Sequence, residues 1–273
     1  MMSRIKMLIR LSALIALPAL LALGQHPSAP ERKIKLFNAH DLKGWYTWVR
    51  DDRYDDPSHV FTVADGMIRI SGEKWGGIAT RREFRDYHLA VEWRWGTKTW
   101  GARETKARDS GILIHGVGED GAASGVWLES IESQIIEGGS GDILFVAGKA
   151  KPTGSAKLRE LGKESYWDSN GAASDKIVSR IDWWGRSPEW KDERGFRGAR
   201  DLEKPTGEWN RQEIYADGDK ISFVLNGRLV NQAYNLTHRY GKIQIQSEGA
   251  EIFVRKVEIQ PIASAPPIPS AKP

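Results

Sequence analysis

The sequence predicts an all-β protein, a two-sheet β-sandwich or jelly roll that carries one long loop insertion. From Ile34 onward, apolar residues recur with a period of two. Gly or Asp-Gly turn signals interrupt this pattern about every ten residues, and no convincing helical period lies between them. A series of at least ten short strands is typical of two packed sheets.

The N-terminal residues predict a secretory signal peptide. Arg4, Lys6 and Arg10 precede an apolar run over residues 11–23, and small residues before Gln25 suit cleavage there. A membrane-spanning helix needs about 20 apolar residues, and this run has 13. An uncleaved anchor is the alternative interpretation. We expect an exported protein, periplasmic or extracellular, that has no membrane contact once the leader is removed.

Composition excludes several classes of function. The 273-residue chain becomes 249 residues without a 24-residue leader, a length that suits one domain. The leader carries three cations and no acids, so the net charge of +4 falls to +1, which does not indicate a nucleic-acid partner. The absence of cysteine excludes disulfides and thiol catalysis. The 12 tryptophans include more than a core needs, and an exposed indole suits stacking on a sugar ring.

Alternation and turn residues define the strands in order. The predicted strands are 60–63, 67–70, 87–95, 112–115, 130–136, 143–146, 213–215, 221–225, 229–234, 242–247 and 252–260. The segment 148–207 lacks alternation, so it is predicted as long loops over one end of the sandwich, with Trp183 and Trp184 as candidate sugar-stacking residues. The predicted domain spans 31–262, and a Pro-rich disordered tail is expected over 263–273.

The same alternation assigns polar side chains to outer faces. Residues two apart in a strand point the same way, so isoleucines and leucines go to the core and their polar neighbours face outward. If the strands share a sheet, the outward residues form a polar floor that can pair with sugar hydroxyls. These residues are Glu92, Arg94, His115, Glu132, Gln134, Gln244, Gln246 and Glu248.

Glu132 and Glu137 form the densest acidic motif. Their odd spacing places them on opposite faces of a regular strand, but one bulge residue would bring them together. That pair is similar to the carboxylates of laminarinase-like retaining glycosidases, although Gln134 stands where those enzymes have Asp. No cofactor is required by the sequence. A divalent metal on Glu132, Glu137 or Asp142 is a further possibility.

The order of several short motifs resembles the 3-keto-disaccharide hydrolase domain family over about residues 34–262. The motifs include Leu36-Phe37-Asn38, Asp41-Leu42-Lys43-Gly44-Trp45, Asp109-Ser110-Gly111-Ile112, Ile131-Glu132-Ser133-Gln134-Ile135, Leu225-Asn226-Gly227 and the run 241–249. The sequence departs from the family pattern at Asp109, which replaces a common Asn, and at Glu248, which replaces a common His.

The resemblance implies a concanavalin-like jelly roll and cleavage of glycosides already oxidised at C3, with a separate sugar 3-oxidoreductase supplying the ketone. A C3 ketone acidifies the C2 proton, so a base can remove it and expel the C1 substituent. The candidate bases are Glu132 and His115. Candidate substrate-binding residues are Arg94, Gln134, Gln246, Glu248, Asp109, Trp183 and Trp184. The alternatives are a non-catalytic carbohydrate-binding module and a retaining glycosidase that uses Glu132 and Glu137.

Overall fold

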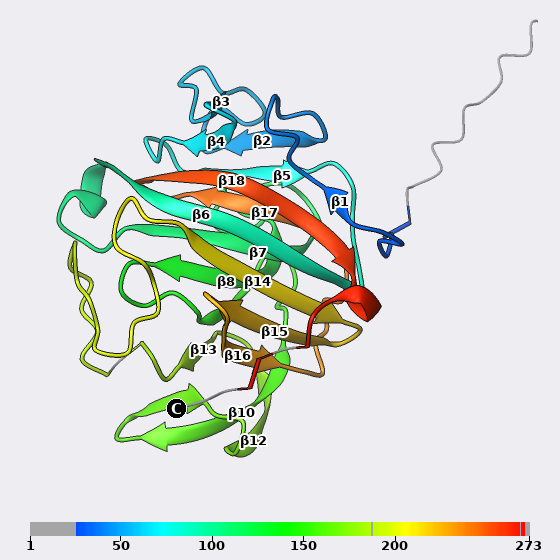
Figure 1. The fold of residues 1–273 in the computed structure, drawn as a ribbon, viewed down its shortest axis with the longest axis vertical. Helices are drawn as coiled ribbons and strands as arrows, with labels where there is room; N and C mark the ends of the chain where they lie inside the picture. Colours follow the sequence, from blue (N-terminus) through cyan, green and yellow to red (C-terminus); the bar gives the residue numbers. More distant parts are fainter. Residues whose placement is uncertain (1–25, 187, 268, 271–273) are drawn as a thin grey trace, which may run out of the picture.

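The computed structural model describes residues 26–186, 188–267 and 269–270 (Figure 1). The predicted signal peptide therefore lies outside the described residues, as does the end of the predicted tail. Within the described part of the chain, no helix is long and apolar enough to cross a membrane. Its helical elements are the short 3₁₀ turns η1 (Gly101–Glu104) and η2 (Ile262–Ser264).

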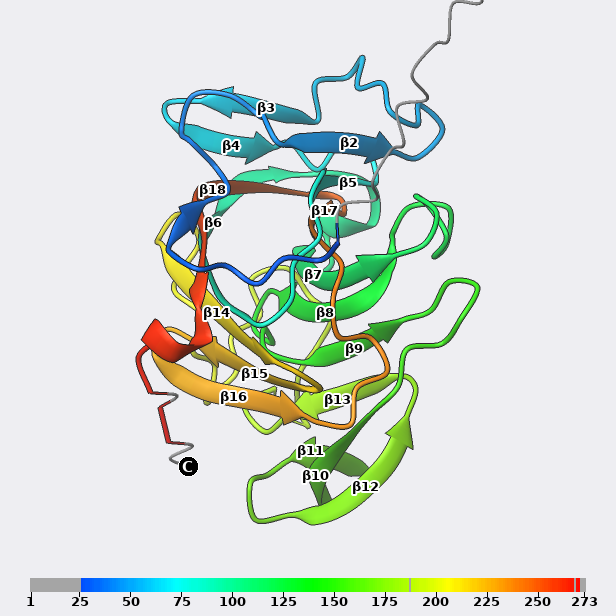
Figure 2. The ribbon, with the colours of Figure 1, turned by 90° about the vertical axis from the view of Figure 1, so that its right-hand side faces the viewer.

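Two sheets lie face to face and confirm the predicted β-sandwich (Figure 2). One sheet has eight strands in the order β16 (Arg228–Ala233), β15 (Lys220–Leu225), β14 (Asn210–Asp217), β6 (Tyr87–Thr99), β18 (Ala250–Pro261), β4 (Met67–Ile70) and β3 (Phe61–Ala64), with β1 (Ile34–Lys35) also paired to β18.

The other sheet has ten strands and carries the candidate site on its outer face. Its order is β12 (Ala172–Ile177), β10 (Gly154–Leu161), β11 (Glu164–Trp167), β13 (Arg180–Trp183), β9 (Ile143–Val146), β8 (Glu129–Ile136), β7 (Asp109–Val117), β17 (Lys242–Ser247), β5 (Gly76–Thr80) and β2 (Trp45–Val49).

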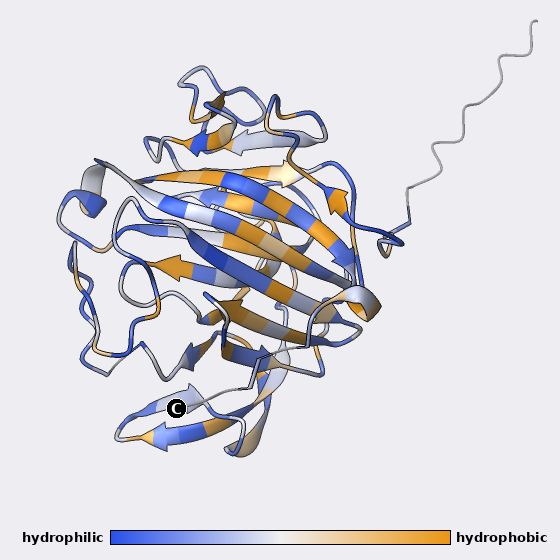
Figure 3. Cartoon of the chain, in the orientation of Figure 1, coloured by the Kyte–Doolittle hydropathy of each residue, from blue (hydrophilic) through white to orange (hydrophobic). Residues whose placement is uncertain are grey.

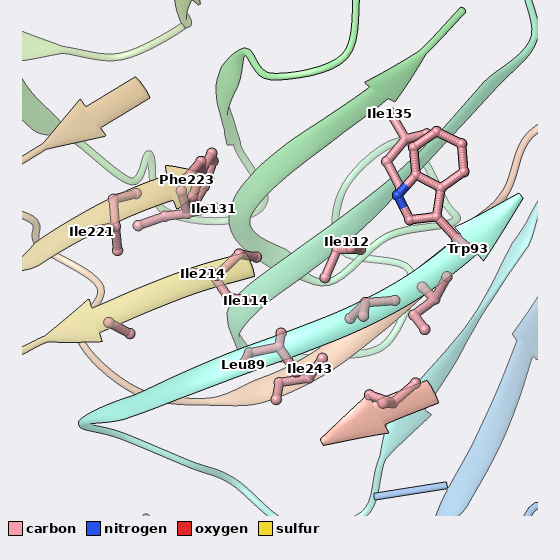
Figure 4. Packing of buried hydrophobic residues seen from close by; sticks show 14 of the residues in the cluster. Leu89, Trp93, Ile112, Ile114, Ile131, Ile135, Ile214, Ile221, Phe223 and Ile243 are labelled. Atoms are coloured by element: carbon pink, nitrogen blue, oxygen red, sulfur yellow. The ribbon is translucent and has the colours of Figure 1, made fainter. Parts of the chain in front are cut away.

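The hydrophobic core lies between the two sheets, as the period-two pattern predicts. Hydrophobic and hydrophilic residues alternate along β6, β14 and β18 (Figure 3). Isoleucines from β7, β8 and β17 meet Leu89 and Trp93 of β6 in a single cluster, and these side chains are almost completely buried (Figure 4). Burying one such side chain contributes about 1.5–3 kcal/mol, so this apolar face determines which way each strand turns.

The segment 148–207 is not a set of long loops, and that prediction was wrong. Four strands, β10 to β13, extend the ten-stranded sheet, while residues 148–153 and the described residues from 184 to 207 lie outside any strand or helix. Most of the side chains in β12 and in the second half of β10 are exposed or only partly buried. A strand that is exposed to solvent on both faces needs no alternation of apolar and polar residues, so the sequence of these strands carries no period-two signal.

Candidate functional site

The candidate site begins on the outer face of the ten-stranded sheet, where β8, β7 and β17 lie side by side. The register pairs Gln134 with Gly111, and it pairs Leu113 with both Glu132 and Gln244. Alternation along β17 places Gln246 on the same face as Gln244. The structure therefore brings Glu132, Gln134, Gln244 and Gln246 together on one surface.

Gly111 provides the space in which two of these side chains meet. A Cβ atom at this position would overlap the carboxylate oxygen of Glu132 and the amide oxygen of Gln246. The two side chains therefore lie flat across the glycine, where Gln246 is hydrogen-bonded to the Glu132 carboxyl. Any larger residue at position 111 would displace both groups, which gives the Asp-Ser-Gly-Ile motif a structural reason.

Three carboxyl groups surround one guanidinium at this end of the floor. Arg103, from η1, forms an ion pair with Asp109, and it lies 3.6 Å from the Glu248 carboxylate. Gln134 Nε2 donates a hydrogen bond of 2.6 Å to the other oxygen of Asp109. Asp109 and Glu132 are both buried, at 6% and 4% exposed. The cluster thus holds Asp109, Glu132 and Glu248 close together. Arg103 contacts Asp109, Glu248 and also Asp192, at 3.4 Å, whereas Arg180 is the arginine whose charge acts on Glu132.

Burial and mutual repulsion make these carboxyls weak acids. Burial, followed by the nearby Glu248 charge, raises the pKa of Glu132 to about 8. Burial also raises the pKa of Asp109 well above its usual value, again with a contribution from Glu248 and against the opposing effect of Arg103. The pKa of Glu248 itself is raised by burial. Glu132 therefore exchanges its proton near neutral pH, which suits proton transfer.

A pocket of about 370 Å³ leads to Arg103 from solvent, and Trp75 and Trp100 line it. Each of these indoles is 37% exposed, and Trp75 stacks on Trp127 at 6.1 Å between ring centroids. Sequence reasoning did not single out either tryptophan. Each stands directly before a glycine, but so does the buried Trp95, so the sequence carries no signal that separates them from core tryptophans.

The predicted catalytic His115 lies between the sheets, so the prediction of an outward ring was wrong. A bulge in β7 between Ile114 and Val117 breaks the alternation, and His115 adopts a φ of 54°. The ring is fully buried, its Nδ1 lies 3.0 Å from the His238 carbonyl, and it contacts the core residue Tyr87 edge-on. Burial lowers the pKa of His115 to about 4.

Arg94 lies in the eight-stranded sheet, away from the Glu132 surface, so the prediction that they share a floor was wrong. Its guanidinium lies over the rings of Trp209 and Phe253. Period two sorts the faces of one strand, but it does not say which sheet the strand joins. Arg94 and Glu132 occupy the outer faces of opposite sheets.

Trp183 does not offer its ring to a sugar, because it is completely buried in the core. Trp184 is partly buried, packs edge-on against Trp183 and is flanked by Arg200 and Arg228. These positions were predicted to lie in a loop, and the strand β13 turns Trp183 inward instead.

Glu137 does not join Glu132. The register of β7 with β8 is regular from Asp109 to Ile114, so the bulge expected before Glu137 is absent and the carboxylate pairs with Arg108 instead. Asp142 is held by the Trp183 amide at 3.0 Å and lies 3.5 Å from Arg186. Burial, followed by the charge of the neighbouring Asp182, raises its pKa to about 7.

The predicted metal ligands therefore do not converge. Across the described ranges, no group of three or more His, Asp or Glu side chains is arranged to hold a metal ion. Glu132, Glu137 and Asp142 each have a different set of partners, and we assign no chemical step to a metal at these residues.

Comparison with solved structures shows the fold. A putative glycosyl hydrolase from Parabacteroides distasonis matches with a TM-score of 0.50 and 18% identity, over 85% of this chain and 94% of the other. A second such structure from the same organism has a TM-score of 0.48 and 17% identity, over 85% and 100% of the two chains. A search of curated protein sequences found no match.

The sequence was also compared with family models. The model described as the 3-keto-alpha-glucoside-1,2-lyase-like domain matches residues 32–260, nearly the whole described structure. The resembling motifs and the sandwich architecture fall within this range. The chain therefore belongs to the 3-keto-alpha-glucoside-1,2-lyase-like domain family and is a glycosidase-like or carbohydrate-binding protein.

Proposed function

We propose that this protein cleaves the glycosidic bond of sugars oxidised to a ketone at C3, by removing the C2 proton. The observation that carries the proposal is the buried Glu132 carboxyl, whose pKa is raised to about 8 and which lies against an amide and beside two further carboxyls. A general base works best when its pKa lies near the working pH. The family description, a 1,2-lyase-like domain, agrees with chemistry at C1 and C2.

The reaction is an elimination followed by hydration. Glu132 takes the proton from C2, and the electron pair of that C–H bond moves onto the C3 carbonyl oxygen as an enolate. The enolate then re-forms the ketone, the C1=C2 bond forms, and the bond from C1 to the leaving oxygen breaks. A proton goes to that oxygen. Addition of water across C1=C2 completes a net hydrolysis.

The neighbours of Glu132 suit the remaining roles. Arg103 lines the pocket and contacts Asp109 and Glu248 of the carboxyl cluster, so it is our candidate for stabilising the enolate oxygen. Asp109, with its raised pKa, is our candidate acid for the leaving oxygen. Trp75 and Trp100 provide apolar faces on which a pyranose ring can stack.

The positions of Glu132 and Glu137 do not support a retaining mechanism. That mechanism needs two carboxyls about 5–5.5 Å apart across the sugar. Glu137 is instead bound to Arg108 by both its side chain and its backbone, with the Arg108 amide donating at 3.2 Å. An elimination needs one base and a stabilised enolate, and the Glu132 surface supplies both.

The test follows hydrogen at C2. Purified protein is incubated with 3-keto-trehalose and with trehalose in D₂O, and the released sugar is analysed by mass spectrometry and NMR. We expect release from the ketone alone, with deuterium incorporated at C2. The variant Glu132→Gln should lose turnover, while the matched control Glu160→Gln, at an exposed position of β10, should keep it.

Other outcomes would contradict the proposal. Turnover of trehalose, or release from the ketone without deuterium at C2, would point to direct displacement. Saturable sugar binding, followed by tryptophan fluorescence, without any turnover would identify a binding module.

We further propose that the protein is exported and works downstream of a separate sugar oxidoreductase. The basic and apolar leader supports export. The ketone must come from another enzyme because the elimination itself is redox-neutral.

A further inference from the structure

A second pocket lies at the β2 edge of the ten-stranded sheet. It has a volume of about 590 Å³, within the range of small-ligand sites. Its polar and aromatic lining includes Tyr46, Tyr54, Arg81, Asp120 and Lys242. These residues come from β2, β17 and three different loops, which the fold brings together at this edge (Figure 2).

The loop between β7 and β8 separates this pocket from Glu132. Four strand spacings of about 4.8 Å divide Tyr46 on β2 from Glu132 on β8, roughly 19 Å in all. Between them the loop covers Leu113 with an apolar cluster that includes Trp127, and the Leu128 amide donates to Gln244 Oε1 at 3.2 Å. The two sites are therefore distinct, and the second one does not depend on the proposed reaction.

A chain of hydrogen bonds fixes the tyrosines of the pocket. The Lys242 ammonium donates to Tyr46 Oη at 2.8 Å, and Tyr46 in turn donates to Asp120 Oδ1 at 2.5 Å. Tyr54 Oη donates to the other Asp120 oxygen at 2.9 Å. Asp120 is thereby occupied on both oxygens, and burial together with this bond raises the pKa of Tyr46, which keeps its proton.

Arg81 and Lys242, the two cations of the pocket, have N–H groups that are available to bind a ligand. Among the residues that the structure describes, no carboxylate lies within ion-pair distance of Arg81 or Lys242. Both cations lie near the Tyr46 ring, at 5.7 and 4.7 Å from its centroid. Tyr54 is 61% exposed and presents an open ring beside them. A ligand that fits this lining has an acceptor-rich negative group and an apolar face.

We propose that this pocket binds a carboxylate-bearing sugar, such as a uronic acid unit. Arg81 and Lys242 hold the carboxylate through charge-assisted hydrogen bonds, and the Tyr54 ring stacks on the C–H face of the pyranose. The site is an accessory one that holds an acidic saccharide about 19 Å from the carboxyl cluster.

Binding of D-glucuronic acid and D-glucuronamide, which share a ring and differ in charge, tests the proposal. Chemical shifts or tryptophan fluorescence of the purified protein would be followed to 100 mM ligand at low salt. We expect the acid to bind at least fivefold more tightly than the amide and to weaken with added salt. Lys242→Met and Arg81→Gln should each reduce affinity at least fivefold, and Lys163→Met, at the exposed turn after β10, should not.

Three results would overturn the proposal. These are no saturable binding of glucuronate, equal affinity for the acid and the amide, and equal binding of inorganic phosphate, which would indicate an anion site without sugar recognition. Melting temperatures of the variants show whether they fold. If Lys242→Met unfolds, Arg81→Gln, whose residue is exposed, carries the test alone.

Discussion

The raised pKa of Glu132 makes a prediction about stability that needs no substrate. Burial and the Glu248 charge raise this pKa from 4.5 to about 8, so the folded protein holds the proton more tightly than the unfolded chain does. The contribution of Glu132 to the free energy of unfolding is therefore most favourable at low pH, and it is lost as the pH rises from about 4.5 to about 8. Each pKa unit corresponds to about 1.4 kcal/mol, so the change between pH 5 and pH 8 is roughly 3 kcal/mol.

The substitution Glu132→Gln removes this titration while keeping the shape of the side chain. We expect the wild-type protein to lose roughly 3 kcal/mol more of its free energy of unfolding than the variant between pH 5 and pH 8. Urea denaturation at the two pH values, followed by tryptophan fluorescence, measures the difference. Glu160→Gln, which changes an exposed carboxylate in β10, is the matched control and should follow the wild type.

A parallel loss of stability in wild type and Glu132→Gln would refute the reasoning. It would mean that the Glu132 carboxyl is ionised in the folded protein near its ordinary pKa, and that burial is offset by water or by Arg180, whose charge favours the ionised form. The base assignment would then lose its support, because an ordinary carboxylate is a weaker base.

Three further predictions concern the same site and the core. Gly111→Ala places a Cβ on the Glu132 and Gln246 side chains, so turnover should fall at least tenfold with a smaller effect on substrate affinity, as steady-state kinetics will show. Trp100→Ala in the pocket should raise KM about tenfold and leave kcat within about threefold, because it removes a stacking surface rather than a reacting group. Ile112→Ala opens a cavity in the fully buried core and should cost about 2–5 kcal/mol in urea denaturation, without changing the register of β7. Unchanged kinetics in the first two variants, or a cost under about 1 kcal/mol in the third, would contradict these assignments.

The fold class follows from local information. Alternation and turn residues depend only on neighbours in the chain, and they identified strands such as β4, β9 and β17 with the observed bounds. The same rule placed Glu132 and Gln134 on the outward face of β8 and Gln246 on the outward face of β17, because a regular strand leaves no other arrangement once its isoleucines enter the core.

The surroundings of Glu132 required the tertiary structure. Arg103 comes from a 3₁₀ turn, and no periodicity connects it with Glu132. Alternation placed Glu248 on the polar face with Gln244 and Gln246, but only the structure shows that its carboxylate lies 3.6 Å from Arg103. The errors have the same origin. A bulge in β7 turns His115 inward, and Arg94 lies in the other sheet from Glu132. Glu137 forms an ion pair with Arg108 and does not join Glu132.

The sequence alone thus determined most strands of the sandwich and the faces of side chains along its regular strands, because both depend on the short-range alternation of apolar and polar residues. Only the tertiary structure decided which sheet each strand joins and which charges meet, because those depend on contacts between residues far apart in the chain. The pKa of Glu132 is an example, because burial of the carboxyl and repulsion by Glu248, which follows β17, together raise it.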